Sequence, residues 1–199
     1  SQTRRKRKVS LPALLAIAKT LCLSYNKRQN RKFQKAEMEN LNKYVSIYKE
    51  QLNKGDILIA YNELVKFVMK LRTVFIKNLC GQYTFTGILH GYMDYTYFYY
   101  SNDLLKSKNL KLGLVLNHLE MRFEVWLLGN TKPIQKKYWE LLKRTKWNKD
   151  KTVMPKYSIL EAPLVENPDF NNLNALTKEI ENGMIKVSDD ILGYLKTLN

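Results

Sequence analysis

The sequence predicts an α+β fold: an antiparallel β-meander packed against helices, with a long central helix and a basic N-terminal extension. Changes in hydrophobic spacing indicate this order. Apolar residues recur every three to four positions over 38–79, alternate over 83–128, and return to helical spacing after residue 131. Helices followed by a run of strands and then by more helices are typical of α+β domains.

The composition changes sharply at the start of the chain. Residues 1–36 contain 11 Lys or Arg and no acid, and Glu37 is the first acidic residue. The rest of the chain holds the other 23 basic residues and all 18 acids, so the net charge of +16 divides into +11 and +5. We therefore assign 1–37 to a basic extension that is disordered or not native to the domain. Residues 38–199 form the predicted single domain.

Two helices are expected first. Apolar residues between 41 and 52 share one face of a helix over 38–52, which ends before Gly55. Asp56 is a suitable N-cap for a second helix over 56–79, and Gly81 fits the position just beyond its end. This second helix would be about 36 Å long and is the expected centre of the domain.

Strands are expected over 83–88, 94–100, 111–117 and 121–128. In the second of these, Tyr95, Tyr97 and Tyr99 point to one face of the sheet. The third and fourth have apolar residues at every second position and only a short link between them, which predicts an antiparallel hairpin.

The C-terminal part is predicted to be mostly helical. A helix capped by Thr131 leads to an irregular or extended segment over 152–162, and Pro163 and Pro168 bracket a loop. One helix then runs from 171 or 172 to Gly183, and Ser188 caps a separate last helix.

Residue counts exclude several classes of chemistry. With two Cys and two His, the chain offers no set of ligands at zinc spacing and no disulfide framework. No phosphate-binding glycine loop, metalloprotease motif or nucleophile elbow occurs, so we expect no cofactor, no metal and no catalytic set. No apolar stretch reaches the roughly 20 residues that span a bilayer. A reducing compartment, the cytoplasm, is the default location.

The strands supply the leading candidate for a binding surface of a ligand or protein partner. Aromatic rings there would stack on a flat ligand and a guanidinium would pair with an anion. The alternative is a half-exposed sheet with a cross-strand ion pair, or a face that a helix covers. The candidate residues are Tyr95, Tyr97, Tyr99, His118, Arg122, Glu124 and Trp126.

Nucleic-acid binding is the second hypothesis. Basic runs bind phosphate backbones, and Tyr and Trp between the lysines of the helix over 132–149 could stack on bases. A solvated helix face and a targeting segment are the competing interpretations of these basic residues. The candidate contacts are Arg4, Arg5, Lys6, Arg7, Lys8, Lys136, Lys137, Lys143 and Arg144.

An enzyme is the third hypothesis. His118, Glu120, Arg122 and Glu124 lie on the 117–126 hairpin and could serve as an acid–base set. This requires the four side chains to converge within hydrogen-bond reach. Side chains that point to opposite faces of the hairpin would exclude it.

Several stretches also resemble one family of proteins. They include Gly91-Tyr92-Met93-Asp94, Asn117-His118, Arg122-Phe123-Glu124-Val125-Trp126 and Glu166-Asn167-Pro168-Asp169-Phe170. Together they resemble an uncharacterised bacterial family of domains of unknown function, over about 38–198. The resemblance implies a bacterial, cytoplasmic, single-domain protein, and it implies no activity.

Overall fold

The computed structural model describes residues 41–198, which fall into two units, 41–60 and 61–198. The first unit contains α2 (Leu41–Lys54) and the beginning of α3 (Asp56–Asn78). No residue of α2 is buried, although the sequence gives it an apolar face. The predicted extension over 1–37, including Arg4, Arg5, Lys6, Arg7 and Lys8, lies outside the described residues.

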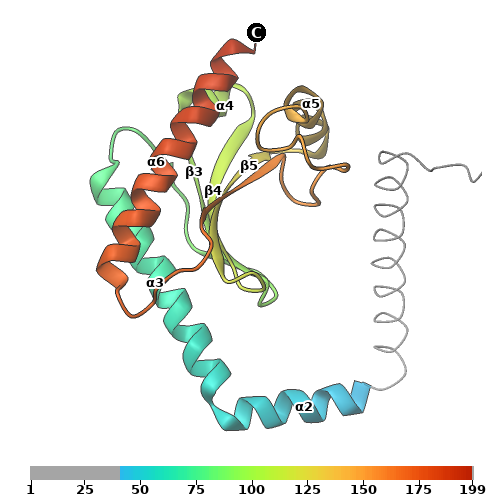
Figure 1. Cartoon of the computed structure of the whole chain (residues 1–199), viewed down its shortest axis with the longest axis vertical. Helices are drawn as coiled ribbons and strands as arrows, with labels where there is room; N and C mark the ends of the chain where they lie inside the picture. Colours follow the sequence, from blue (N-terminus) through green and yellow to red (C-terminus); the bar gives the residue numbers. More distant parts are fainter. Residues whose placement is uncertain (1–40, 199) are drawn as a thin grey trace, which may run out of the picture. The chain divides into compact units, whose positions relative to one another are not determined.

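The predicted α+β class is confirmed. The described part contains five helices and a six-stranded antiparallel sheet (Figure 1). After α3 the elements are β1 (Thr84–Phe85), β2 (Leu89–His90), β3 (Tyr95–Ser101), α4 (Asp103–Ser107), β4 (Leu110–Asn117), β5 (Arg122–Gly129), α5 (Lys132–Leu142), β6 (Leu160–Val165) and α6 (Leu173–Thr197).

The sheet is a meander at its centre. Its order is β1-β3-β4-β5-β6, and β2 also pairs with β3. All neighbours are antiparallel, and the register sets Tyr97 opposite Val115 and Val115 opposite Glu124. Because side chains alternate along a strand, this register separates the two faces residue by residue.

Helices α3 and α6 pack on one face of the sheet, which we call the covered face. The two helices run beside each other (Figure 1), and the Asn78 amide donates to the Glu181 carboxylate at 2.7 Å. Both contribute to one large core with the inward residues of β3, β4 and β5. That core includes Phe67, Leu71 and Phe75 of α3, Met184 and Ile191 of α6, and Phe98, Leu114 and Leu127 of the strands. This core is the main source of stability in the second unit.

The C-terminal elements differ from the prediction. The two expected helices are one helix, α6, because its buried residues continue through Met184 and Ser188 without a break. Ser188 is therefore no cap. It lies in mid-helix, fully buried, and its hydroxyl hydrogen-bonds that of Tyr100 at 2.8 Å.

The position of Pro163 is a second difference. The sequence placed it at the start of a loop, yet it lies inside β6, opposite Glu124. A strand at the edge of a sheet accepts proline because one row of its backbone groups has no partner strand. β6 is such an edge, and the pairing shifts register between Phe123 and Glu124.

None of the helices described between residues 41 and 198 combines the length and the apolar character that crossing a bilayer requires.

Candidate functional site: an aromatic cavity on the open sheet face

The face of the sheet opposite to α3 and α6 carries a second, much smaller cluster. We call it the open face. Val115, Trp126 and Leu128 are buried there, and the half-buried rings of Tyr95, Tyr97 and Tyr99 pack against them. The cluster contains no residue of the described helices. The three tyrosines share this face because they alternate with Thr96, Phe98 and Tyr100, which are buried on the other side.

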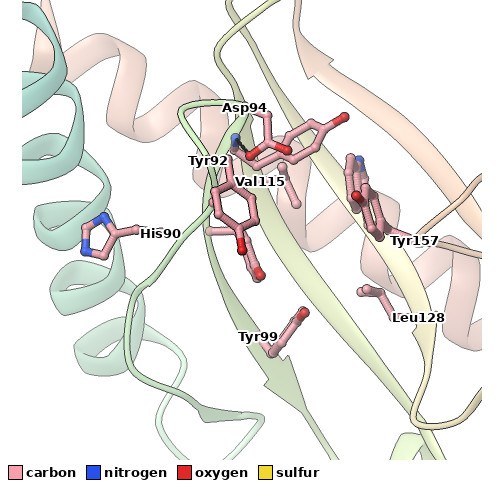
Figure 2. Close-up of a pocket in the computed structure, with 11 residues that line it drawn as sticks. His90, Tyr92, Asp94, Tyr99, Val115, Leu128 and Tyr157 are labelled. Carbon is pink, nitrogen blue, oxygen red and sulfur yellow. Dashed lines mark hydrogen bonds between the residues drawn. The ribbon is translucent and has the colours of Figure 1, made fainter. Parts of the chain in front are cut away.

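A cavity of about 270 Å³ opens on this face. Figure 2 shows its side chains, which come from β2 and the turn after it, from β3, β4 and β5, and from the loop before β6. Val115 and Leu128 provide aliphatic surface, and the imidazole of His90 points away from the rings. The lining residues are His90, Gly91, Tyr92, Asp94, Tyr95, Tyr97, Tyr99, Val115, Trp126, Leu128 and Tyr157.

The rings meet at steep angles. Tyr95 lies edge-to-face with Trp126, with centroids 4.9 Å apart and planes at 69°. Tyr95 and Tyr157 are 6.4 Å apart at 79°. Tyr97 and Tyr99 form a tilted pair at 5.3 Å. Rings crossed in this way present both faces and edges to one small space, instead of a single flat stacking surface.

The turn between β2 and β3 forms one rim of the cavity. Gly91 N–H donates to the Tyr95 carbonyl at 2.8 Å, and Tyr95 N–H donates to the Asp94 carboxylate at 2.8 Å. Met93 has a left-handed backbone conformation, with φ of 64°. A Cβ on Gly91 would lie 2.1 Å from the Asp94 carboxylate oxygen. A side chain at position 91 would therefore require the Asp94 carboxylate to move.

A buried polar network holds Trp126 in place. Glu124 is 1 % exposed and accepts hydrogen bonds from the Trp126 indole, the Arg122 guanidinium and the Asn117 amide. The side-chain oxygen Oδ1 of Asn117 in turn accepts from two backbone N–H groups of the β4–β5 turn. Trp126 is thus tied through Glu124 to the end of the hairpin, which fixes the orientation of the cavity wall.

Burial and charge act on the phenols of the cavity. Burial, followed by the negative charges of Asp94, Glu161 and Glu124, raises the pKa of Tyr95 above its usual value. Burial, and then the neighbouring Tyr97, raises the pKa of Tyr99. Both side chains therefore stay protonated at neutral pH and act as uncharged hydrogen-bonding groups.

The structure divides the predicted site residues into three groups. Tyr95, Tyr97, Tyr99 and Trp126 line the cavity. Arg122 and Glu124 share the open face, but their charges meet each other beside the cavity wall. His118 belongs to the opposite side: its imidazole bonds the Thr96 hydroxyl at 2.8 Å and its ring lies 5.5 Å from Tyr61 of α3.

This placement corrects two interpretations. His118 does not belong to the aromatic face, because this residue just after β4 contacts Thr96 and Tyr61 on the covered side. It is also separated from Glu124 by the sheet, so the enzyme hypothesis on the 117–126 hairpin loses its converging set. Burial lowers the pKa of His118 more than the nearby Asp94 raises it.

Seven of the eleven lining residues are not among the predicted site residues, and they include Tyr92, Asp94 and Tyr157. Tyr92 and Asp94 directly precede the tyrosine strand, so the turn motif was the available signal. Tyr157 comes from a loop about 60 residues further along the chain, and local periodicity gives no indication that it reaches β3.

The basic helix over 132–149 also differs from its prediction. Lys136, Lys137 and Arg144 are exposed, and Lys143 pairs with Glu140. Two of the aromatic rings between them face inward, since Tyr138 and Trp139 are 5 % and 9 % exposed. Trp147 is half-buried, packs on Tyr194 and lines a hollow with it. Tyr138 and Trp139 are therefore not available to stack on bases.

Within residues 41–198, no three His, Cys, Asp or Glu side chains are grouped so that they could hold a metal ion.

A comparison with protein families matches residues 41–195 to a domain of unknown function, DUF7000. This match covers most of the chain. The chain belongs to the DUF7000 family. The resemblance seen in the sequence is thereby confirmed, and the DUF7000 match assigns no chemistry. Comparisons with curated proteins and with solved structures yield no match.

Proposed function

We propose that this DUF7000 protein is a non-enzymatic binding module whose ligand enters the aromatic cavity on the open face. The observation that supports this most strongly is the position of Trp126. A large aromatic side chain faces the side of the sheet that α3 and α6 leave open, and a buried carboxylate fixes it there. Preorganised aromatic surface beside a cavity is a common feature of ligand sites.

The dimensions favour a small ligand. Pockets for drug-sized molecules usually have volumes of roughly 300 to 1,000 Å³, and this cavity is just below that range at about 270 Å³. The polar groups at hand are phenols, the Asp94 carboxylate and backbone atoms, while the His90 imidazole points away from the rings. No general base in the cavity contacts a nucleophile, which favours binding over catalysis.

The test is a ligand-observed NMR screen of small fragments on the full chain, using cationic, anionic and neutral compounds. We expect hits that disappear in Val115→Phe, which fills the cavity floor. Leu119→Phe, at an exposed turn position, is the matched control and should retain them. Near-UV circular dichroism confirms that each variant is folded. Hits that persist in Val115→Phe would contradict the proposal.

Nucleic-acid association is a second candidate, supported by the exposed cations Lys136, Lys137 and Arg144 of the helix region. Contacts of this kind weaken with salt, by a slope of about 0.9 per phosphate in log–log terms. Fluorescence anisotropy with the double variant Lys136→Glu/Lys137→Glu tests it. An unchanged affinity would exclude this face as the contact.

The bacterial origin and cytoplasmic location stay predictions. They rest on the resemblance and on the low cysteine count.

A further inference from the structure

We infer that the ligand of the aromatic cavity is a small organic cation, a compact ammonium group whose charge is shielded by methyl or methylene carbons. This inference rests on the proposed function, since it specifies the ligand class of the same cavity. It is carried by the combination of crossed aromatic rings with a single carboxylate at the rim.

The lining of the cavity is chemically one-sided. Six of its eleven residues are aromatic Tyr or Trp: Tyr92, Tyr95, Tyr97, Tyr99, Trp126 and Tyr157. Asp94 is the one acidic residue in the lining, and the lining includes no Lys or Arg. The faces of aromatic rings carry negative partial charge, so rings and carboxylate attract the same kind of ligand.

The negative groups are concentrated at the end where Tyr95, Trp126 and Tyr157 meet. Figure 2 shows Asp94 beside Tyr92 on this rim, and Tyr157 across from them. Glu161 and Glu124 lie close enough to raise the pKa of the Tyr95 phenol together with Asp94. Glu124 is neutralised by Arg122 and Glu161 by Lys151, whereas no Lys or Arg of the described residues lies within ion-pair distance of Asp94. The pKa of the exposed Lys156 is raised by its hydrogen bond to Tyr157 and also by the charge of Asp94. An incoming cation therefore has one carboxylate to pair with.

The protein itself already places cations on two of these rings. The ammonium of Lys111 lies 3.9 Å from the centroid of Tyr99, and that of Lys156 lies 4.8 Å from the centroid of Tyr157. Neither lysine lines the cavity. Burial lowers the pKa of Lys111, and the face of the Tyr99 ring is a favourable neighbour for its charge.

The apolar floor of the cavity limits the type of cation that can bind. A strongly hydrated ammonium would lose its water shell on entering an aliphatic and aromatic space floored by Val115 and Leu128. A methylated ammonium loses far less hydration and gains contact with the floor. Repulsion from Lys156 is weakened by solvent, because that side chain is fully exposed.

A second surface of the molecule provides an internal contrast. The hollow lined by Trp147 and Tyr194 contains two carboxylates, Asp189 and Asp190, and also two cations, Arg144 and Lys146. Lys146 pairs with Asp190 at 2.6 Å. The formal charges of this hollow cancel, so a combination of aromatic rings with carboxylates is not by itself enough to attract a cation. The cavity on the open face combines them without an opposing Lys or Arg in its lining.

The decisive experiment is isothermal titration of the full chain with choline and with 3,3-dimethylbutan-1-ol. The two probes have the same shape, and carbon replaces the charged nitrogen in the second. We expect choline to bind at least tenfold more tightly than the alcohol. Asp94→Asn keeps the side-chain oxygen that accepts from Tyr95 N–H but removes the charge, and should weaken choline about fivefold.

Two further variants make the result specific. Tyr157→Leu removes a ring from a loop residue that is 49 % exposed, so it spares the core and should also weaken choline. Asp103→Asn is the control, because that carboxylate is fully exposed and lines no part of the cavity. The affinity of Asp103→Asn for choline should equal that of the wild type.

The outcomes separate this inference from the proposed function. Equal or tighter binding of the uncharged alcohol overturns the cation inference and leaves the cavity as a binding site. An absence of choline binding also overturns it, while the fragment screen decides independently whether the cavity binds anything. Binding that Asp94→Asn and Tyr157→Leu leave unchanged would place the cation elsewhere and contradict the inference.

Discussion

The two faces of one sheet differ in how their aromatic residues are used. On the covered face, Phe98 and Tyr100 are fully buried under α3 and α6. On the open face, Tyr95, Tyr97 and Tyr99 of the same strand are half-buried around a cavity. A single strand thus supplies stability through its even-numbered residues and a candidate site through its odd-numbered ones. Rings that stay accessible without a covering helix are the ones to test for function.

The polar groups follow the same division. On the covered face they form hydrogen bonds within the core, such as that between the hydroxyls of Tyr100 and Ser188. On the open face the buried Glu124 positions Trp126 beside the cavity. The first kind of contact stabilises the fold alone. The second kind also sets the geometry of a surface that a ligand can reach.

The prediction with the largest expected effect compares substitutions at two neighbouring residues of β3, one on each face of the sheet. Phe98→Ala should lower the free energy of unfolding by about 4 kcal/mol, because it leaves a cavity in a fully buried core. Tyr97→Ala should cost about 1 kcal/mol, since its ring is already half exposed. Urea unfolding followed by circular dichroism measures both. Equal costs would show that the two faces are not different in kind.

The next effect concerns the network behind Trp126. Glu124→Gln should cost about 2 kcal/mol, because it removes the charge that Arg122 needs in a buried site. Glu120→Gln is the matched control: its carboxylate is 4.0 Å from Arg122, half exposed, and should cost less than about 0.5 kcal/mol. Choline titration of both variants adds a functional readout. A Glu124→Gln protein with full stability and unchanged binding would contradict the positioning role.

A smaller effect is expected for the contact between Ser188 of α6 and Tyr100 of β3. Ser188→Ala leaves the buried Tyr100 hydroxyl without its partner and should cost about 1.5 kcal/mol. Adding Tyr100→Phe removes that orphaned group, so the double variant should be no less stable than Ser188→Ala alone. Thermal unfolding of the two single variants and the double variant completes the cycle. Strictly additive costs would show that the two hydroxyls do not interact.

The smallest effect is the pH dependence from His118. Burial lowers its pKa in the folded protein below the value of about 6.5 expected when unfolded. The unfolded chain therefore binds more protons, and stability should be complete above pH 6.5 and decrease as the pH falls toward the folded pKa. Urea midpoints between pH 8 and pH 5 should decrease less in His118→Gln than in the wild type. Identical slopes would contradict this role.

The sequence predicts the fold class well because it depends on local periodicity. The alternation over 94–100 and 111–128 is enough to place Tyr95, Tyr97 and Tyr99 on one face, and Trp126 with them. The prediction of a helix break before Ser188 is wrong, because a serine beside apolar residues gives the same sequence pattern whether it caps a helix or hydrogen-bonds a buried tyrosine. The long-range register that makes Ser188 face Tyr100 is absent from any local window.

The candidate site was only partly predictable for the same reason. Whether a given strand face is covered depends on where distant helices pack, and alternation does not specify this. His118 was grouped with Glu124 by sequence proximity, yet the pleat sends the two side chains to opposite faces. Tyr157 reaches the cavity from a loop, where no periodic pattern indicates its position.

The most direct test of the difference between the two faces is an NMR titration of the full chain with tetramethylammonium. The chain contains three tryptophans, so three indole N–H signals can be followed at once. Trp126 lines the cavity, whereas Trp139 is buried elsewhere and Trp147 packs on Tyr194. We expect a saturable shift of the Trp126 signal alone, and in Asp94→Asn we expect the same shift to need about fivefold more tetramethylammonium to saturate. A shift confined to Trp147, or no shift at any indole, would contradict the open face as the binding face for an organic cation.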